Sequence, residues 1–128
     1  MGKYGQAALT AVNFLHSSIS NSPLDAWEKA TKEIFGDGSW GQIKGCPRST
    51  FLGLCEEGLI KGVISGEYTK SKKNKGYGIK AIELISKNPS LLKSTDILWE
   101  LVLDGKNISH NSQMDVVTSL WLNNLIEK

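Results

Sequence analysis

The chain has 128 residues, 40% of them hydrophobic, with four tryptophans and a formal net charge of +2. This length is typical of one domain, and the composition can fill a core without a metal ion or a disulfide bond. No apolar run approaches the roughly 20 residues that cross a bilayer, so we expect a single cytoplasmic domain over residues 1–128 with no membrane contact.

The first third of the sequence predicts two helices. Apolar residues recur every three or four positions between Tyr4 and Ile19, as they do on one face of a helix. A second helix begins at Ser22-Pro23, because serine can accept hydrogen bonds from the first amides and proline suits the first helical position. Its predicted buried stripe consists of Leu24, Trp27, Ala30 and Ile34.

A glycine-rich connection and a third helix follow. Residues 36–41 match the Gly-x-Gly-x-x-Gly pattern of dinucleotide sites, but a helix precedes them instead of a strand, so we expect a flexible connector and no cofactor. Pro47 then opens a third helix that ends at Gly58. Most of its residues are apolar, which predicts a central position. Its one polar stripe consists of Ser49, Gly53, Glu56 and Glu57.

Residues 59–70 predict a short β-hairpin. Leu59 to Ile64 is rich in β-branched residues, Ser65-Gly66 is typical of a turn, and Glu67 to Lys70 supplies the second arm.

Three further helices are predicted after the hairpin. The first begins near Gly76 and ends at Asn88-Pro89, the second is capped by Ser94, and the last begins at Ser112. The core face of the helix after Ser94 is predicted to be Ile97, Leu98, Leu101 and Val102. The sequence thus predicts a mainly α fold of five to six helices around one core, with the hairpin after the third.

The two cysteines, Cys46 and Cys55, have no spacing typical of a metal site, and we expect two reduced thiols and no metal. Cys46 is the more reactive candidate, because a thiol at a helix amino end beside Lys44 and Arg48 lies in a positive field. A thiol-dependent enzyme or redox sensor that uses Cys46 is therefore one alternative function. A catalytic pair with His110 would require the fold to bring the two together.

The basic side chains concentrate in the middle of the chain. Residues 44–80 hold eight basic and three acidic side chains, whereas the rest of the chain holds seven and ten. Within this region a lysine-rich segment is flanked by aromatic rings: Tyr68, Lys70, Lys72, Lys73, Lys75 and Tyr77. Lysines attract phosphate and tyrosines can stack on bases, so the segment is either a solvated loop or a contact for an anion such as nucleic acid. Arg48 is the candidate for a base contact.

A polar cluster precedes the last helix. Capping explains Ser112 and Asp115 but not their neighbours, so the second interpretation is a small polar binding site made of His110, Asn111, Gln113 and Asp115. The leading functional hypothesis is a non-catalytic binding or regulatory module whose basic loop engages an anionic partner. A structural protein–protein interaction domain is the third alternative, and the sequence leaves the oligomeric state open.

Two resemblances add to these predictions. The order of two helices, a third helix and a basic hairpin resembles a winged helix-turn-helix domain, in which the third helix enters the major groove. Glu56 and Glu57, and the long connection before that helix, depart from the pattern. The segments KGCPRSTFLGLCEEGLIKGV, YTKSKKNKGY and HNSQMD resemble a small bacterial family of uncharacterised proteins, a domain of unknown function. That resemblance implies no activity, but it suggests that the three segments contribute to one site.

Overall fold

The structure is a computed structural model that describes residues 2–108 and 112–127. In this part the elements are α1 (Lys3–His16), α2 (Pro23–Phe35), α3 (Trp40–Ile43), α4 (Gly45–Glu56), α5 (Lys72–Lys87), the 3-10 helix η1 (Pro89–Lys93), α6 (Thr95–Leu103) and α7 (Gln113–Leu122). The predicted mainly α fold is confirmed. The helices outnumber the prediction because the glycine-rich connection contains α3 and because η1 follows α5.

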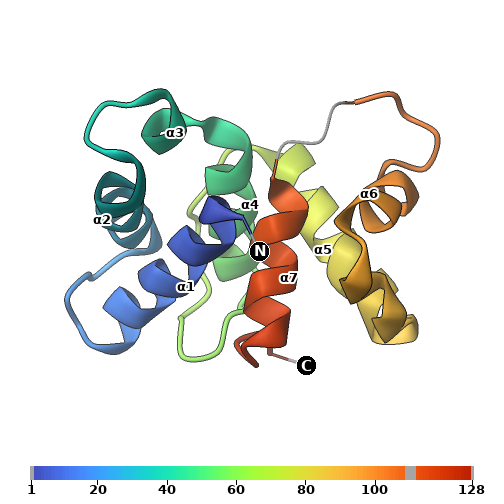
Figure 1. The fold of residues 1–128 in the computed structure, drawn as a ribbon. Helices are drawn as coiled ribbons and strands as arrows, with labels where there is room; N and C mark the ends of the chain where they lie inside the picture. The colour runs from blue at the N-terminus through green and yellow to red at the C-terminus, as the bar shows by residue number, and fades with distance from the viewer. Residues whose placement is uncertain (1, 109–111, 128) are drawn as a thin grey trace.

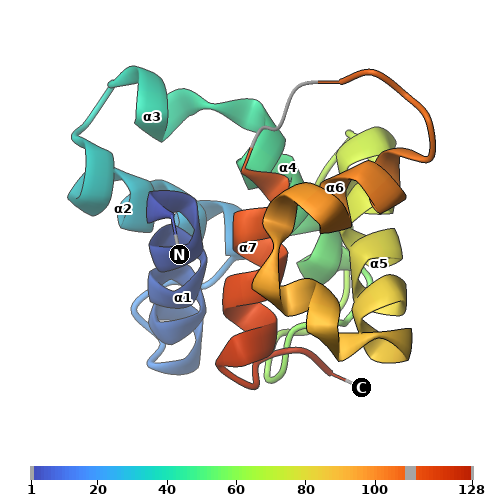
Figure 2. The ribbon, with the colours of Figure 1, turned by 45° about the vertical axis from the view of Figure 1, so that its right-hand side comes forward.

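Helices α4 and α7 lie in the middle of the molecule (Figure 1). Helices α1 and α2 pack on one side of this pair, and α5 and α6 pack on the other (Figures 1 and 2). The core between them is largely aliphatic, with Trp27 of α2 stacked on Phe51 of α4 at 5.2 Å between ring centroids. Both rings are almost completely buried, so α4 is fixed from several sides.

Local sequence signals placed several helix ends correctly. The Ser22 hydroxyl accepts a hydrogen bond from the Asp25 amide at 3.2 Å, and Ser94 accepts one from the Ile97 amide at 3.3 Å. Helix α4 ends two residues before Gly58, which has a φ of 72° that only glycine adopts without strain. These positions were predictable because capping depends on residues one to three places apart.

The apolar faces were predicted less well. Four residues assigned to those faces are exposed by 43–55%: Ile19, Leu24, Ile97 and Leu101. In α6 the buried face is rotated from the predicted one, since Trp99 points inward and packs edge-on against Tyr77 of α5 at 5.2 Å. A bulky aromatic pair across two helices therefore set the orientation of α6, and the spacing within one helix could not reveal it.

The predicted β-hairpin over residues 59–70 is wrong. These residues form no strand pair with one another, and Ile60 instead makes an antiparallel bridge with Ile126 near the end of the chain. The Lys61 amide donates to the Leu125 carbonyl at 2.9 Å, and the Glu127 amide donates to the Leu59 carbonyl at 2.7 Å. The β-branched pattern did mark a residue that pairs as in a β-sheet, but the residue that pairs with Ile60 is more than sixty positions away.

Candidate anion-binding face

Helix α4, the predicted groove-reading helix, is a core helix. Eight of its twelve residues are buried, and the close approach of α5 leaves no room at Gly53. A Cβ at Gly53 would lie 2.6 Å from the Cβ of Lys75 and 2.8 Å from its Cα. Helix α4 is thus mostly covered, and residues 59–70 form no strand pair with one another.

The side chain of Glu56 organises the lysine-rich segment from inside. It is 6% exposed, and its Oε1 accepts hydrogen bonds from the amides of Tyr68 at 2.9 Å and Thr69 at 3.2 Å. Its Oε2 pairs with the ammonium groups of Lys75 at 2.5 Å and Lys72 at 3.2 Å. The Lys75 ammonium, followed by the two amides, holds the pKa of Glu56 well below its usual range. Glu56 therefore faces the lysines of the segment.

Lys75 is consequently a structural residue. Its side chain is 14% exposed, and its ammonium group also pairs with Glu57 Oε1 at 2.5 Å. The hydrogen bond to Glu56 and then that to Glu57 raise the pKa of Lys75. Two carboxylates thus neutralise it, which removes Lys75 from the predicted phosphate contacts. Lys72 stays 71% exposed despite its ion pair.

Only the second part of the lysine-rich segment is helical, since Lys72, Lys73 and Lys75 form the first turn of a helix while Tyr68 and Lys70 precede it. Helix α5 begins at Lys72, four residues earlier than predicted. Lysines at a helix amino end oppose the helix dipole, and the carboxylates of Glu56 and Glu57 at the end of α4 offset that repulsion. Neither carboxylate is a sequence neighbour of the lysines. Rules for helix starts, which consider only nearby residues, therefore did not predict that α5 begins at Lys72.

Tyr68 and Lys70 line a groove of balanced charge. This groove, about 740 Å³, is bordered by three acidic and three lysine side chains, with Tyr68 between them. The Tyr68 hydroxyl donates to the Ile64 carbonyl at 2.6 Å. Equal numbers of acids and lysines give such a groove little net attraction for an anion.

A second cleft, between α5 and α6, is strongly basic. Its volume is about 360 Å³, and its charged lining residues are Lys72, Lys73, Lys80, Lys106 and Asp104. Within the described residues, Lys73, Lys80 and Lys106 make no ion pair. Three ammonium groups without an ion pair to a described residue, beside that of Lys72 with its ion pair to Glu56, thus border a small cleft with one carboxylate, a charge balance that favours an anionic occupant.

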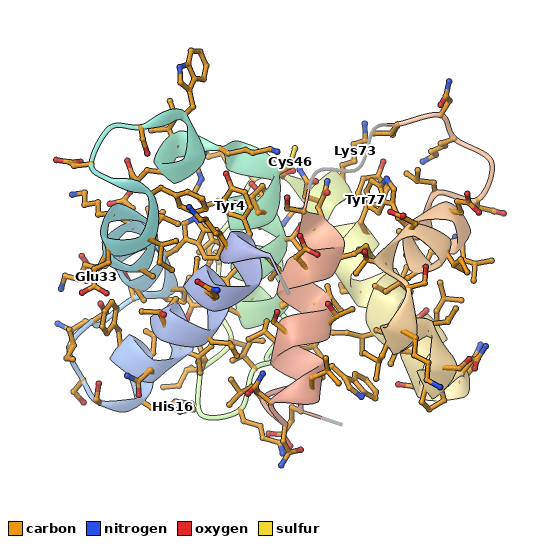
Figure 3. The ribbon with its side chains drawn as sticks, in the orientation of Figure 1. Tyr4, His16, Glu33, Cys46, Lys73 and Tyr77 are labelled. Carbon is orange, nitrogen blue, oxygen red and sulfur yellow. The ribbon has the colours of Figure 1, made fainter. Side chains whose placement is uncertain are left out.

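Tyr77 forms part of the wall of this basic cleft (Figure 3). The residue is 7% exposed, and its hydroxyl has no hydrogen-bond partner within residues 2–108 and 112–127. The Lys106 ammonium lies 5.9 Å from the centroid of its ring. Buried hydroxyls are nearly always paired, so the Tyr77 hydroxyl is an exception among the described residues.

The amino end of α7 lies against the amino end of α5. Gln113 Nε2 donates to Asn74 Oδ1 at 3.1 Å, and Asn74 Nδ2 donates to Ser71 Oγ at 3.0 Å. The structure thereby brings Gln113 next to the lysine-rich segment, although Gln113 itself is 1% exposed. Asp115 instead lies near Gly2, where a Cβ would be 2.7 Å from its Oδ2. The predicted residues His110 and Asn111 lie outside the described residues.

Comparison with known proteins gives a family but no activity. The profile of a family of unknown function, DUF6979, matches residues 1–127. The chain belongs to this family. No curated protein and no solved structure matches it significantly. In this DUF6979 chain, no helix of the described residues is long and apolar enough to cross a membrane.

The predicted catalytic partner of Cys46, His110, lies outside the described residues, so the structure describes only the cysteine half of that pair. Cys46 is partly exposed in the first turn of α4, and no hydrogen bond to its sulfur is found in the part of the chain that the structure describes. Figure 3 shows His16 at the opposite end of the molecule, where its Nε2 lies 2.6 Å from the Lys61 carbonyl oxygen. Cys55 is buried, which raises its pKa. Within the described residues, no three His, Cys, Asp or Glu side chains are placed to hold a metal ion.

Sequence reasoning missed three members of the basic cleft. Lys80 was counted only as part of the charge of the middle region, and Tyr77 only as a flanking ring. Lys106 follows the end of α6, in a region where acidic side chains outnumber basic ones. The helical spacing of Lys73, Tyr77 and Lys80, four and three residues apart, was the available signal that they share one face.

Proposed function

We propose that this protein is a non-catalytic binding module that holds an anionic partner, with nucleic acid first, at the basic cleft between α5 and α6. The observation that carries the proposal is the set of unpaired ammonium groups of Lys73, Lys80 and Lys106, opposed by Asp104 alone among the described lining residues. Unpaired lysines gathered at one place release counterions when they meet phosphates, and this release drives binding to nucleic acids.

The helix dipoles add to the positive charge. Helices α4, α5 and α7 all begin at the same end of the molecule (Figures 1 and 2). The hydrogen bond between Gln113 and Asn74 joins two of these amino ends. Each helix amino end carries a partial positive charge, so the field of the backbone and the charge of the lysines have the same sign there.

Fluorescence anisotropy with labelled single-stranded and duplex DNA tests the proposal. The variant Lys73→Glu/Lys106→Glu removes two cleft lysines, and Lys87→Glu/Lys93→Glu is its matched control on exposed lysines away from the cleft. Both variants change the formal net charge from +2 to −2. We expect the cleft variant to lose about tenfold or more in affinity at about 50 mM salt, and to flatten the salt dependence by roughly two phosphate contacts. Equal losses in both variants, or no binding by the wild type, would refute the proposal.

A further inference from the structure

Helix α3 presents a tryptophan almost fully to solvent. Trp40 is 89% exposed and its neighbour Ile43 is 51% exposed, whereas Trp27 and Trp99 are 1% and 4% exposed. A large aromatic ring in water forgoes most of the free energy that burial would give. The position of Trp40 is therefore compatible with a contact that forms only when a partner binds.

The turn that carries Trp40 is held firmly in place. The Tyr4 hydroxyl donates to the Gly41 carbonyl at 2.9 Å, and the Ser39 hydroxyl accepts from the Gln42 amide at 3.2 Å while donating to the Gly36 carbonyl at 2.8 Å. Gly41 packs so closely on Phe35 that a Cβ would lie 2.5 Å from the ring. The indole thus projects from an ordered base, which lowers the entropy lost on binding.

Three cations lie on segments next to this turn. The Lys44 ammonium lies 5.7 Å from the centroid of the Tyr4 ring, and the Lys3 ammonium lies 5.9 Å from that of Phe35. Arg48 follows one turn into α4, and none of these three cations forms an ion pair with a described residue. An exposed indole among unpaired cations is complementary to a ligand that offers both phosphates and flat aromatic faces.

We infer that Trp40 stacks on an unpaired base of single-stranded nucleic acid while Lys3, Lys44 and Arg48 contact the flanking phosphates. This inference rests on the proposed function and names its ligand class. A duplex covers the faces of its bases by stacking them on one another, whereas a single strand can open a base face to an indole. Stacking is tolerant of base identity, so the preference concerns strandedness and not sequence.

The test compares Trp40→Ala, Trp40→Phe and the control Ile64→Ala, which removes another highly exposed apolar side chain from the segment between α4 and α5. The probes are labelled oligo(dT) of about 20 nucleotides and a duplex of the same length. We expect the wild type to prefer the single strand. Trp40→Ala should weaken single-strand binding about tenfold and leave duplex binding unchanged, Trp40→Phe should keep most of the affinity, and Ile64→Ala should bind like the wild type.

The outcomes separate this inference from the proposed function. If Trp40→Ala binds the single strand as tightly as the wild type, or loses single-strand and duplex binding equally, base stacking by Trp40 is refuted. The proposed anion binding at the basic cleft is not refuted by either result. An apolar contact with a protein partner would then be the remaining role of Trp40. If the wild type binds neither probe, both proposals are refuted together. Trp40→Ala should unfold at the wild-type temperature, because its side chain contributes almost nothing to the core.

Discussion

Replacing Gly53 by alanine tests whether α4 is a core helix. In an open helix this change is favourable by about 1 kcal/mol, because alanine has the higher helix propensity. Here the new methyl group would lie 2.6 Å from the Cβ of Lys75 and 2.8 Å from its Cα, so α5 must move. Lys75 resists movement, since its ammonium group is bound to Glu56 and Glu57 at 2.5 Å each.

The net effect follows from these two opposing contributions. Overpacking costs about 1–3 kcal/mol, and the clash with a second backbone places Gly53→Ala in the upper part of that range. We therefore expect the free energy of unfolding to fall by about 1–2 kcal/mol, and Tm to fall by roughly 3–8 °C for a chain of this size.

Gly76→Ala is the matched control, because Gly76 also lies in a helix, has no positive φ, and has nothing within 4 Å of an added Cβ. It should raise the free energy of unfolding by about 0.5–1 kcal/mol. Urea unfolding followed by circular dichroism measures both variants. If Gly53→Ala stabilises the protein as much as Gly76→Ala does, the burial of α4 is wrong, and an exposed face on this helix is again available for a partner.

Three further predictions concern single side chains. Glu56→Gln should lower the free energy of unfolding at pH 7. The difference from the wild type should shrink below about pH 5, because the Glu56 carboxyl protonates near pH 4.3 in the unfolded chain while its pKa in the folded chain is far lower. Urea titrations that give the same difference at every pH would contradict this. Iodoacetamide should modify Cys46 in the native protein but Cys55 only after unfolding, since Cys55 is buried with a raised pKa; intact-mass spectra that show double labelling without denaturant would contradict it. Tyr77→Phe should leave the free energy of unfolding unchanged or raise it by about 1 kcal/mol, because the lost hydroxyl has no partner among the described residues; a clear loss of stability in urea would show that it has one.

The sequence predicted the elements whose signals are local. Ser22 and Ser94 cap helices as expected, and α5 ends at the predicted Asn88-Pro89. The central position of α4 also followed from its composition, because a helix with so few polar residues is stable only when neighbours cover it. These inferences needed no knowledge of contacts distant in sequence.

The failures depended on contacts between distant residues. The sequence predicted Ile60 to be part of a hairpin because its bridge to distant Ile126 could not be seen. It predicted a loop at the start of α5 because the contact of Glu56 with Lys72 could not be seen either. Summing charge over a segment failed for the same reason. Lys75 counts as a cation in the sequence but is neutralised in the fold, whereas Lys106 joins the basic cleft from a different part of the chain.

The helical phase of α5 divides its lysines into two sets with different roles. Lys72 and Lys75 are three residues apart and pair with Glu56, although Lys72 also borders the cleft toward α6. Lys73 and Lys80 line that cleft without an ion pair to a described residue. Replacing Lys75 would leave Glu56 buried without its closest partner and would destabilise the protein, so lost binding in such a variant could not be separated from lost folding. Replacing Lys73 breaks no ion pair with a described residue and changes only the field of the cleft. The run of four lysines therefore includes residues that stabilise the fold beside the cleft as well as a residue that lines the cleft. Only substitutions of the cleft lysines that break no such ion pair test the proposed role.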